Sequence, residues 1–219
     1  MNVVFYMENN HVGGMDTFLT NLVNSWGLDK KVVIVCNKSH PGLPVLKLNI
    51  DGKNEFIEHE ILTGYEIIEK VLSSAPLIVK KILRQILKIF LSYYQYKSLI
   101  KVFSKIDSQN LIVINGGYPG GETSRLANIA WHNLNRKNNI HTFHNFSVKP
   151  VSFMKIFDDF IDKKLVNSTN HVVSVSQSCL DSIKLRKHFK ENTSLRYIYN
   201  GVNFNKNTSQ VTFDIRAEL

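Results

Sequence analysis

Asn2-Val-Val-Phe-Tyr-Met7 opens the chain, and a loop that ends in Gly13-Gly14 follows it. The run is short, nearly continuous in apolar residues, and rich in β-branched and aromatic side chains. This composition is typical of a strand that is covered on both faces. After Gly14, apolar residues recur at spacings of three and four, which predicts a helix with one apolar face. That face consists of Met15, Phe18, Leu19, Leu22, Val23 and Trp26.

A strand, a glycine loop and a helix in this order can bind an anion. The first N–H groups of a helix lack partners within the helix, its N-terminal end is positive, and glycines let an anion approach closely. The spacing is not GxGxxG, so a second interpretation stays open. In that interpretation, Gly13 and Gly14 form only a turn that requires positive φ.

Composition restricts the class of protein and of partner. The chain has 219 residues, 43% of them hydrophobic, and a net charge of +9, so acidic partners are expected: nucleotide phosphates, anionic lipid or nucleic acid. Cys36 and Cys179 fall in strand-like and helix-like runs, which predicts buried, reduced thiols rather than a disulfide or a metal site. We find no signal-peptide pattern and no run long enough for a membrane-spanning helix, which predicts a cytoplasmic chain.

Strands and helices are predicted to alternate along the chain. Val45–Ile50 alternates in polarity and is predicted to be a peripheral strand, whereas Asp51–His59 reads as irregular. The other predicted strands are Lys31–Cys36, Leu111–Asn115, Ile140–His144, His171–Ser176 and Leu195–Tyr199. The other predicted helices are Tyr65–Leu72, Pro76–Ile106, Glu122–Asn135, Ser152–Val166 and Gln177–His188. This order predicts an α/β fold with a doubly wound, mainly parallel sheet, whose ligands bind at the carboxyl ends of the strands.

The segment from Pro76 to Ile106 contains no acidic residue. It combines an apolar helical pattern with basic residues, and near its centre, around Tyr93–Tyr96, one helix could pass into another. The pattern predicts an amphipathic helix on an anionic membrane surface; a core helix with a solvated basic face is the alternative. A nucleic-acid-binding module is disfavoured because the basic residues are not interleaved with stacking aromatics on a small sheet. The proposed membrane contacts are Lys80, Lys81, Arg84 and Lys88.

Four segments together resemble glycosyltransferase family 4. They are Gly13-Gly-Met-Asp-Thr-Phe-Leu-Thr-Asn-Leu22, His141-Thr-Phe-His-Asn145, Val172-Val-Ser-Val-Ser-Gln-Ser178 and Ile198-Tyr-Asn-Gly-Val-Asn203. The resemblance implies a GT-B fold, in which two Rossmann-like domains face a cleft and the C-terminal one holds most of the nucleotide sugar. It also implies sugar transfer with retained anomeric configuration to a lipid-linked or polysaccharide acceptor, without a metal or other cofactor.

The domain organisation follows from this resemblance. Residues 1–203 are expected to form the N-terminal, acceptor-side Rossmann-like domain, and residues 204–219 to lead into a C-terminal nucleotide-sugar domain that this sequence does not contain. Such a half alone is expected to be inactive, and Asn203 replaces the usual Asp of the hinge motif. Alternatives are another GT-B enzyme such as a sugar-nucleotide epimerase, or a basic membrane- or nucleic-acid-binding module.

The resemblance also assigns candidate site residues. Gly13 and Gly14 are expected at the donor diphosphate. His144 is the expected catalytic residue near the transferred sugar; the alternative is a structural histidine whose ring is hydrogen-bonded to a backbone carbonyl. His141, on the same strand, is interpreted as structural. The expected acceptor contacts are His11, Tyr118, Asn145 and Ser176, and the expected hinge is Asn200-Gly201; turn or cap roles are the alternatives for Tyr118, Ser176 and Asn200. Partners are a nucleotide sugar, a glycan or lipid-linked acceptor and the inner face of an anionic membrane.

Overall fold

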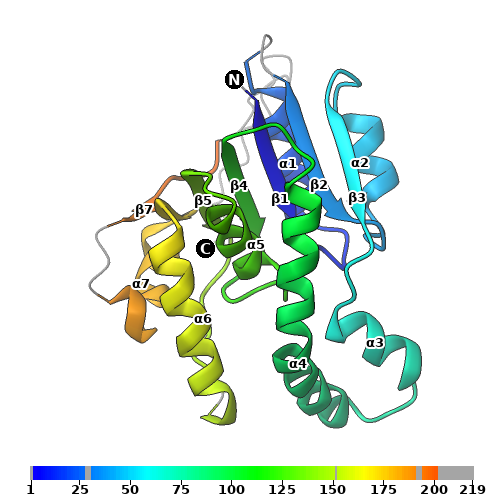
Figure 1. The fold of residues 1–219 in the computed structure, drawn as a ribbon, viewed down its shortest axis with the longest axis vertical. Coiled ribbons are helices and arrows are strands. Elements are labelled where there is room, and N and C mark those ends of the chain that lie inside the picture. Colours follow the sequence, from blue (N-terminus) through cyan, green and yellow to red (C-terminus); the bar gives the residue numbers. More distant parts are fainter. Residues whose placement is uncertain (1, 28–30, 151, 191–193, 202–219) are drawn as a thin grey trace, which may run out of the picture.

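A seven-stranded sheet forms the centre of the molecule in the computed structural model, which describes residues 2–27, 31–150, 152–190 and 194–201 (Figure 1). The strand order is β3-β2-β1-β4-β5-β6-β7, and every neighbouring pair is parallel, as the alternation of strands and helices predicts. The strands are β1 (Val3–Met7), β2 (Val32–Asn37), β3 (Glu55–His59), β4 (Asn110–Asn115), β5 (Asn138–Phe143), β6 (His171–Ser174) and β7 (Leu195–Tyr197).

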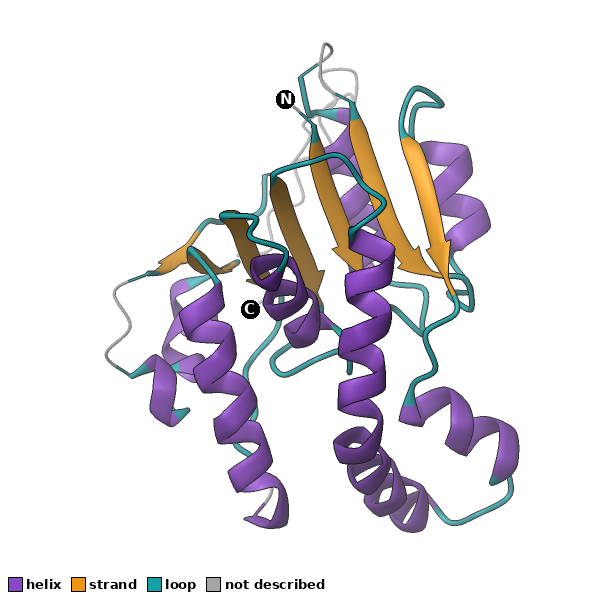
Figure 2. Ribbon diagram, viewed as in Figure 1, coloured by secondary structure: helices purple, strands orange, loops and turns teal. Residues whose placement is uncertain are grey.

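Helices cover both faces of the sheet (Figure 2). The α-helices are α1 (Gly14–Asn24), α2 (Leu43–Asn49), α3 (Gly64–Val71), α4 (Leu77–Phe103), α5 (Ser124–Asn133), α6 (Lys155–Ser168) and α7 (Gln177–Ile183). Two short 3-10 helices, η1 (Ser152–Met154) and η2 (Lys187–Phe189), precede α6 and follow α7. The doubly wound Rossmann-like fold expected from the sequence is therefore confirmed.

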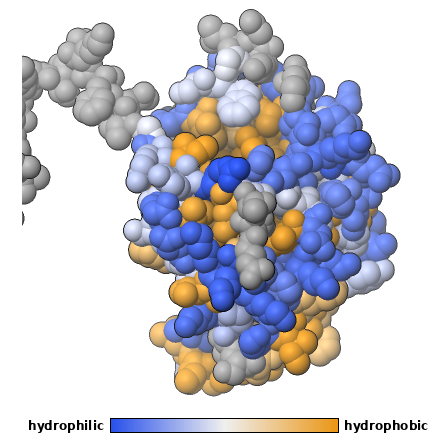
Figure 3. Space-filling view, turned by 90° about the vertical axis from the view of Figure 1, so that its left-hand side faces the viewer, coloured by the Kyte–Doolittle hydropathy of each residue, from blue (hydrophilic) through white to orange (hydrophobic). Residues whose placement is uncertain are grey.

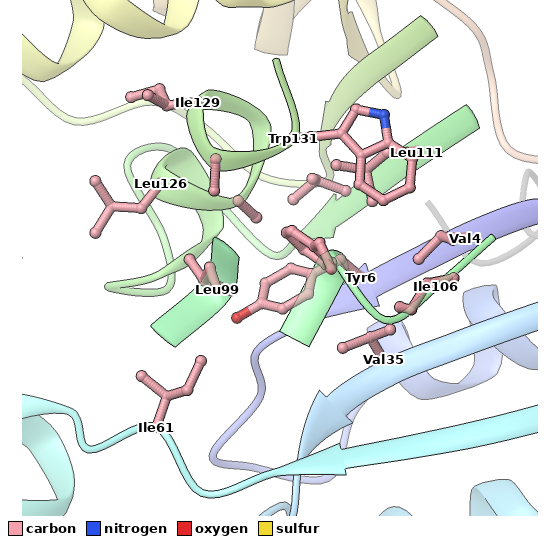
Figure 4. Packing of buried hydrophobic residues seen from close by; sticks show 14 of the residues in the cluster. Val4, Tyr6, Val35, Ile61, Leu99, Ile106, Leu111, Leu126, Ile129 and Trp131 are labelled. Atoms are coloured by element: carbon pink, nitrogen blue, oxygen red, sulfur yellow. The ribbon is translucent and has the colours of Figure 1, made fainter. Parts of the chain in front are cut away.

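Successive residues of β1 enter opposite cores, because side chains alternate across a strand. Val4 and Tyr6 pack with Leu99 and Phe103 of α4 and with Trp131 of α5 (Figure 4). Val3, Phe5 and Met7 pack with α1 and α2 in a second cluster. All five residues of β1 are buried, which explains the continuous apolar run at the start of the chain.

Two predicted elements are wrong at the edge of the sheet. Val45–Ile50 is predicted to be a strand, but its first five residues belong to α2 and Ile50 is the C-cap of that helix. Pro44 lies in the first turn of α2, where the missing N–H of proline costs nothing. The buried residues Leu43, Leu46 and Ile50 are spaced by three and four, so the helical period overrides the apparent alternation. The segment read as irregular contains β3, an edge strand on which Glu55 is solvent-exposed, and this polarity hid the strand.

Four further predictions concern single features. The long basic segment is one continuous helix, α4, and contains no break at Tyr93–Tyr96. Cys36 and Cys179 are free and buried, as predicted. None of the helices in the described ranges is both long enough and apolar enough to cross a bilayer. Asn203 and the predicted linker 204–219 lie outside the described residues.

Candidate functional site

The chain reverses its direction of travel through the sheet between β1 and β4. From β1 it moves to β2 on one side, and it later returns to β4 on the other side. Ligands of open parallel sheets bind at the carboxyl ends of the strands at such a switch point. Here the loops after β1 and β4, together with α3 and α4, border an open cavity of about 180 Å³, which we call the switch pocket. Its walls include His11, Tyr65, Arg84, Asn115, Gly116 and Gly117.

Two buried carboxylates fix the loops around the switch pocket. Glu8 accepts hydrogen bonds from the N–H groups of Glu122 (3.0 Å) and Thr123 (2.6 Å), where α5 begins. Burial raises the pKa of Glu8 above its usual value. Glu122 accepts from the N–H groups of Gly64 (2.6 Å) and Tyr65 (3.0 Å), at the start of α3. Because backbone donors occupy both carboxylates, we assign them to the framework of the pocket rather than to a substrate.

The side chains that line the switch pocket include His11, Tyr65 and Arg84, which offer an imidazole, an aromatic ring and a guanidinium to a ligand. The Arg84 guanidinium lies 4.7 Å from the centre of the Tyr65 ring, and its Nε is 3.7 Å from Glu122 Oε1. The His11 ring meets the same Tyr65 ring edge-on, with 5.8 Å between the ring centres. An aromatic face between an imidazole and a guanidinium suits a polar ligand with a flat or ring-shaped body, such as a sugar.

The start of α1 leaves donors and space for an anion. Gly13 N–H donates to Asp16 Oδ2 (2.9 Å), and Asn9 and His40 also bind this carboxylate. For the N–H groups of Gly14 and Met15, the described part of the chain offers no acceptor. A Cβ added at Gly13 or Gly14 would meet no atom within 4 Å, and neither residue is in the left-handed region: Gly13 is extended, with φ 179°. The interpretation of these glycines as a turn that requires positive φ is therefore wrong.

His144 follows the carboxyl end of β5 and lies beside α1. Its ring centre is 4.1 Å from that of Phe18, one turn into α1. Its backbone N–H donates to Asn115 O (3.0 Å), and its Nε2 lies 3.3 Å from Thr142 Oγ1. Burial lowers the pKa of His144 to about 4. At neutral pH the side chain is therefore an uncharged imidazole, which can exchange a hydrogen bond but carries no charge.

Tyr118 does not line a sugar site in this structure. The side chain is buried among Phe143 and Phe189, and its hydroxyl donates to Asp162 Oδ1 (2.6 Å). The ring is therefore part of the core beneath the loop, and the prediction that it stacks on an acceptor is wrong. The aromatic residue that does line the switch pocket is Tyr65.

The remaining predicted residues occupy different places. Ser176 is the N-cap of α7 and accepts from the N–H of Cys179 (3.2 Å), in agreement with its alternative interpretation as a cap. Asn145 is exposed, and its Oδ1 accepts from the N–H of Phe146 (2.8 Å). Asn200 and Gly201 line a second cavity, of about 520 Å³, together with Gly14 and Phe18. The predicted hinge residues and the start of α1 thus border one space.

Three of the four predicted membrane contacts on α4 are engaged within the molecule. Lys80 pairs with Glu69 (3.2 Å), and Arg84 faces the switch pocket. Lys88 is buried, and this burial lowers its pKa to about 8. Of the four predicted membrane contacts, only Lys81 is exposed without an ion pair among the described residues, so the prediction of a four-residue basic patch is wrong.

Sequence reasoning missed Glu8, Tyr65, Arg84 and Glu122 as parts of the site. Glu8 directly follows the first strand, and Glu122 directly follows the glycine loop Gly116–Gly121, so the predicted strand ends were a signal for both. Tyr65 and Arg84 gave no such signal, because they reach the pocket from two helices. No group of three or more His, Cys, Asp or Glu side chains in the described ranges is placed to hold a metal ion.

The fold resembles that of solved proteins in complex with UDP or a UDP-sugar. Anabaena HepE in complex with UDP matches with a TM-score of 0.56 and 10% identity, over 93% of this chain and 45% of that one. The same protein with UDP and glucose matches with a TM-score of 0.54 and 8% identity, over 92% and 45%. UDP-GlcNAc 2-epimerase from Neisseria meningitidis matches at 0.47 and 10% identity, over 92% and 46%, which is too low to carry an argument.

These likenesses show the fold alone. Neither a protein-family model nor a curated protein matches the sequence. The chain spans less than half the length of each of the solved proteins named above. The described residues share the Rossmann-like fold over that part of each solved protein.

Proposed function

We propose that this chain is the N-terminal, acceptor-side domain of a retaining glycosyltransferase of the GT-B type, similar to family 4. The observation that carries the proposal is the contact between His144 and α1. It places an uncharged imidazole beside a helix start whose N–H groups at Gly14 and Met15 have no acceptor among the described residues. The likeness to HepE, which was solved with UDP and with UDP-glucose, supports a nucleotide sugar as donor.

In this proposal, each part of the site has one task. The N–H groups at the start of α1 stabilise the charge that develops on the leaving diphosphate. His144 hydrogen-bonds a hydroxyl of the transferred sugar, and the acceptor occupies the switch pocket between His11, Tyr65 and Arg84. Such transfer requires orientation and stabilisation of the leaving group more than a strong base. A second domain, reached through the Asn200-Gly201 hinge, holds most of the donor, and no metal takes part.

The acceptor in this proposal is lipid-linked or is a growing polysaccharide. The protein therefore works in the cytoplasm, peripherally on the inner face of an anionic membrane. Because the structure engages Lys80, Arg84 and Lys88 internally, the surface that contacts the membrane must be sought elsewhere on the molecule.

The test uses the complete enzyme, with the second domain present, and the variant His144→Ala. We expect turnover to fall by about 10²-fold or more, because an interaction made at the reacting sugar is lost. His171→Ala is the matched control, since this exposed histidine lies at the start of β6, at the opposite edge of the sheet. The anomeric configuration of the product, read by NMR, tests retention. An unchanged rate for His144→Ala would refute its role.

Two outcomes would redirect the assignment. Calorimetry of the chain alone should detect only weak binding of UDP-sugars, because most donor contacts are assigned to the other domain. Micromolar affinity, or transfer by this chain alone, would show that the halves are misassigned. Conversion of the UDP-sugar to its epimer without any acceptor would favour the epimerase alternative.

A further inference from the structure

Another hollow lies at the amino edge of the sheet, the edge opposite the switch pocket. It crosses the starts of β1, β4, β5 and β6 and reaches the turn that follows α1. Its volume of about 370 Å³ falls within the range of small-molecule sites. We call it the amino-edge pocket. Its lining includes Trp26, Ile112, Asn138, Ile140, Asn170 and His171.

The floor of the amino-edge pocket is sheet surface that the helices of the described chain leave partly open. Helices α1 and α2 pack on one face of β1 and β2, and α4 and α5 pack on the other face. On the α1 side, Ile112 of β4 and Ile140 of β5 lie in register. Both residues are only half-buried, although each of these strands has a neighbour on either side. The space-filling view shows apolar surface towards the same, upper end of the molecule (Figure 3). The pocket therefore offers an apolar floor to a ligand.

Trp26 borders this floor from the turn after α1. Its ring meets the ring of Phe5 edge-on, with 5.2 Å between the ring centres, and the residue is half-buried. The contact with Phe5 holds the indole in place. The indole N–H has no hydrogen-bond acceptor among the described residues. Because an indole combines an apolar ring with one polar donor, Trp26 offers both kinds of contact to a ligand.

Asparagine amides form the polar rim of the amino-edge pocket. The Asn110 amide is engaged within the protein: its Nδ2 donates to Asn2 O (3.0 Å), and its Oδ1 accepts from Asn138 Nδ2 (3.1 Å). Asn170 Oδ1 accepts from the N–H of Asn139 (2.8 Å), which holds the Asn170 side chain in place. Asn138 Oδ1 and Asn170 Nδ2 have no partner in the described part of the chain, and both residues are exposed. One acceptor and one donor therefore remain for a ligand.

The chemistry of this lining selects an uncharged ligand. Its described residues include no Asp, Glu, Lys or Arg, so a diphosphate would find no lysine or arginine to pair with. An aliphatic floor, an indole and neutral amides together suit a ring that has an apolar C–H face and a hydroxyl edge. A pyranose has both features.

We propose that the amino-edge pocket binds an uncharged pyranose unit of an oligosaccharide. The C–H face of the sugar packs against Trp26 and Ile140, and its hydroxyl groups bind Asn138 Oδ1 and Asn170 Nδ2. The donor and acceptor positions of the proposed function lie at the opposite edge of the sheet. The amino-edge pocket is therefore a second saccharide site, and its existence does not depend on that function.

The test follows the indole N–H signals of the ¹⁵N-labelled 219-residue chain by NMR. Maltotriose, cellotriose and triacetylchitotriose are titrated separately, and glucose is titrated in a fourth arm. The chain has two tryptophans, and Trp26→Phe assigns their signals by removing one of them. We expect at least one trisaccharide to shift the Trp26 signal saturably. The signal of Trp131, which is buried under the opposite face of the sheet, should stay unchanged.

Asn170→Asp tests the polar rim. It removes the free amide donor but keeps an oxygen for the N–H of Asn139, and it should raise the Kd of the trisaccharide about tenfold. Asn133→Asp is the matched control, since it introduces the same charge at an exposed asparagine of α5, on the opposite face of the sheet. It should leave the Kd unchanged.

Absence of a saturable shift of the Trp26 signal with all three trisaccharides would overturn the proposal. An equal Kd for the wild type and Asn170→Asp would also overturn it, because the sugar would then bind elsewhere. A response to glucose as strong as that to a trisaccharide would identify a free sugar as the ligand, and a response to a trisaccharide alone would identify a glycan chain. The titration contains no nucleotide sugar, so this inference and the proposed function can fail independently. A dispersed amide spectrum confirms that each variant is folded.

Discussion

Glycines at the carboxyl edge of the sheet have two different physical roles. At Gly14 the backbone is ordinary and the space beside it is empty, so the protein itself does not require glycine. At Gly120, φ is +66°, and an added Cβ would lie 1.8 Å from Asn115 Oδ1. The second glycine is required by the fold, whereas the first leaves room for a ligand. This difference can be tested residue by residue.

Gly120→Ala should destabilise the chain by about 2 kcal/mol or more, since the left-handed conformation and the overlap each cost about 1–2 kcal/mol. Gly14→Ala should leave stability within about 1 kcal/mol. In the complete enzyme, Gly14→Ala should nevertheless lower kcat/KM about tenfold, because the methyl group obstructs the approach of a phosphate; a loss of 1.4 kcal/mol corresponds to that factor. Urea unfolding and steady-state kinetics measure the two effects. Unaltered kinetics for Gly14→Ala would contradict donor binding at α1.

At the scale of elements, the sequence predicts the central strands of the sheet well. It predicts the edge strand and the polar contacts between helices less well. Buried parallel strands such as Val32–Asn37 are continuous apolar runs, so their period and length identify them. The edge strand β3 contains glutamates, so it is not a continuous apolar run and this pattern does not identify it. The switch pocket was predictable only in part. The ends of the predicted strands identify Asn115 and the glycine loop that follows it. Tyr65 and Arg84 lie on helices, and no local sequence pattern shows how those helices pack against the sheet.

A buried ion network joins α5, α6 and the segment after α7, and its members are also far apart in the sequence. Asp162 binds Arg125 (2.7 Å), Arg186 (2.6 Å) and the Tyr118 hydroxyl (2.6 Å), and Arg125 also binds Asp158 (2.6 Å). Arg186 additionally donates to Val148 O (2.7 Å), in the loop that follows His144. The network therefore holds that loop against the helices.

Asp162→Ala should destabilise the chain by about 3–5 kcal/mol, because it leaves two guanidinium groups buried without their shared carboxylate. Asp159→Ala is the matched control on the same helix. Its carboxylate forms only an exposed i,i+4 pair with Lys155, and its loss should cost less than about 1 kcal/mol. Denaturant unfolding compares both variants with the wild type. Equal effects of the two substitutions would show that the buried network contributes no more than a surface pair.

At the scale of the whole molecule, most of the chemistry lies at one edge of the sheet. The switch pocket, the start of α1, His144 and the projecting end of α4 all lie at the carboxyl ends of the strands. Histidines are also buried towards this edge: His59 ends β3, His141 lies within β5, and His144 follows β5. His141 is satisfied as the neutral tautomer, because Nδ1 donates to Asn128 Oδ1 (2.8 Å) and Nε2 accepts from Asn115 (3.4 Å).

Burial of these histidines should make the fold sensitive to acid. It lowers the pKa to about 4 for His59 and His144 and, aided by Arg125, to about 3 for His141, from 6.5 in the unfolded chain. Between pH 6.5 and 4, the unfolded chain therefore binds protons that the folded chain does not, so stability falls as the pH falls. The free energy of unfolding should change by up to about 1.4 kcal/mol per pH unit for each histidine.

His141→Gln should remove one proton from this difference. Its free energy of unfolding, followed by urea titration from pH 6.5 to 5, should therefore fall less steeply on acidification than that of the wild type. The difference in slope should approach 1.4 kcal/mol per pH unit where the unfolded histidine is largely protonated. Glu8 changes the pH dependence of stability in the opposite direction, because its raised pKa lets the folded chain bind a proton at a higher pH than the unfolded chain. This contribution is the same in the variant and the wild type, so it cancels when their slopes are compared. Parallel pH profiles for the variant and the wild type would show that His141 takes up its proton in the folded state.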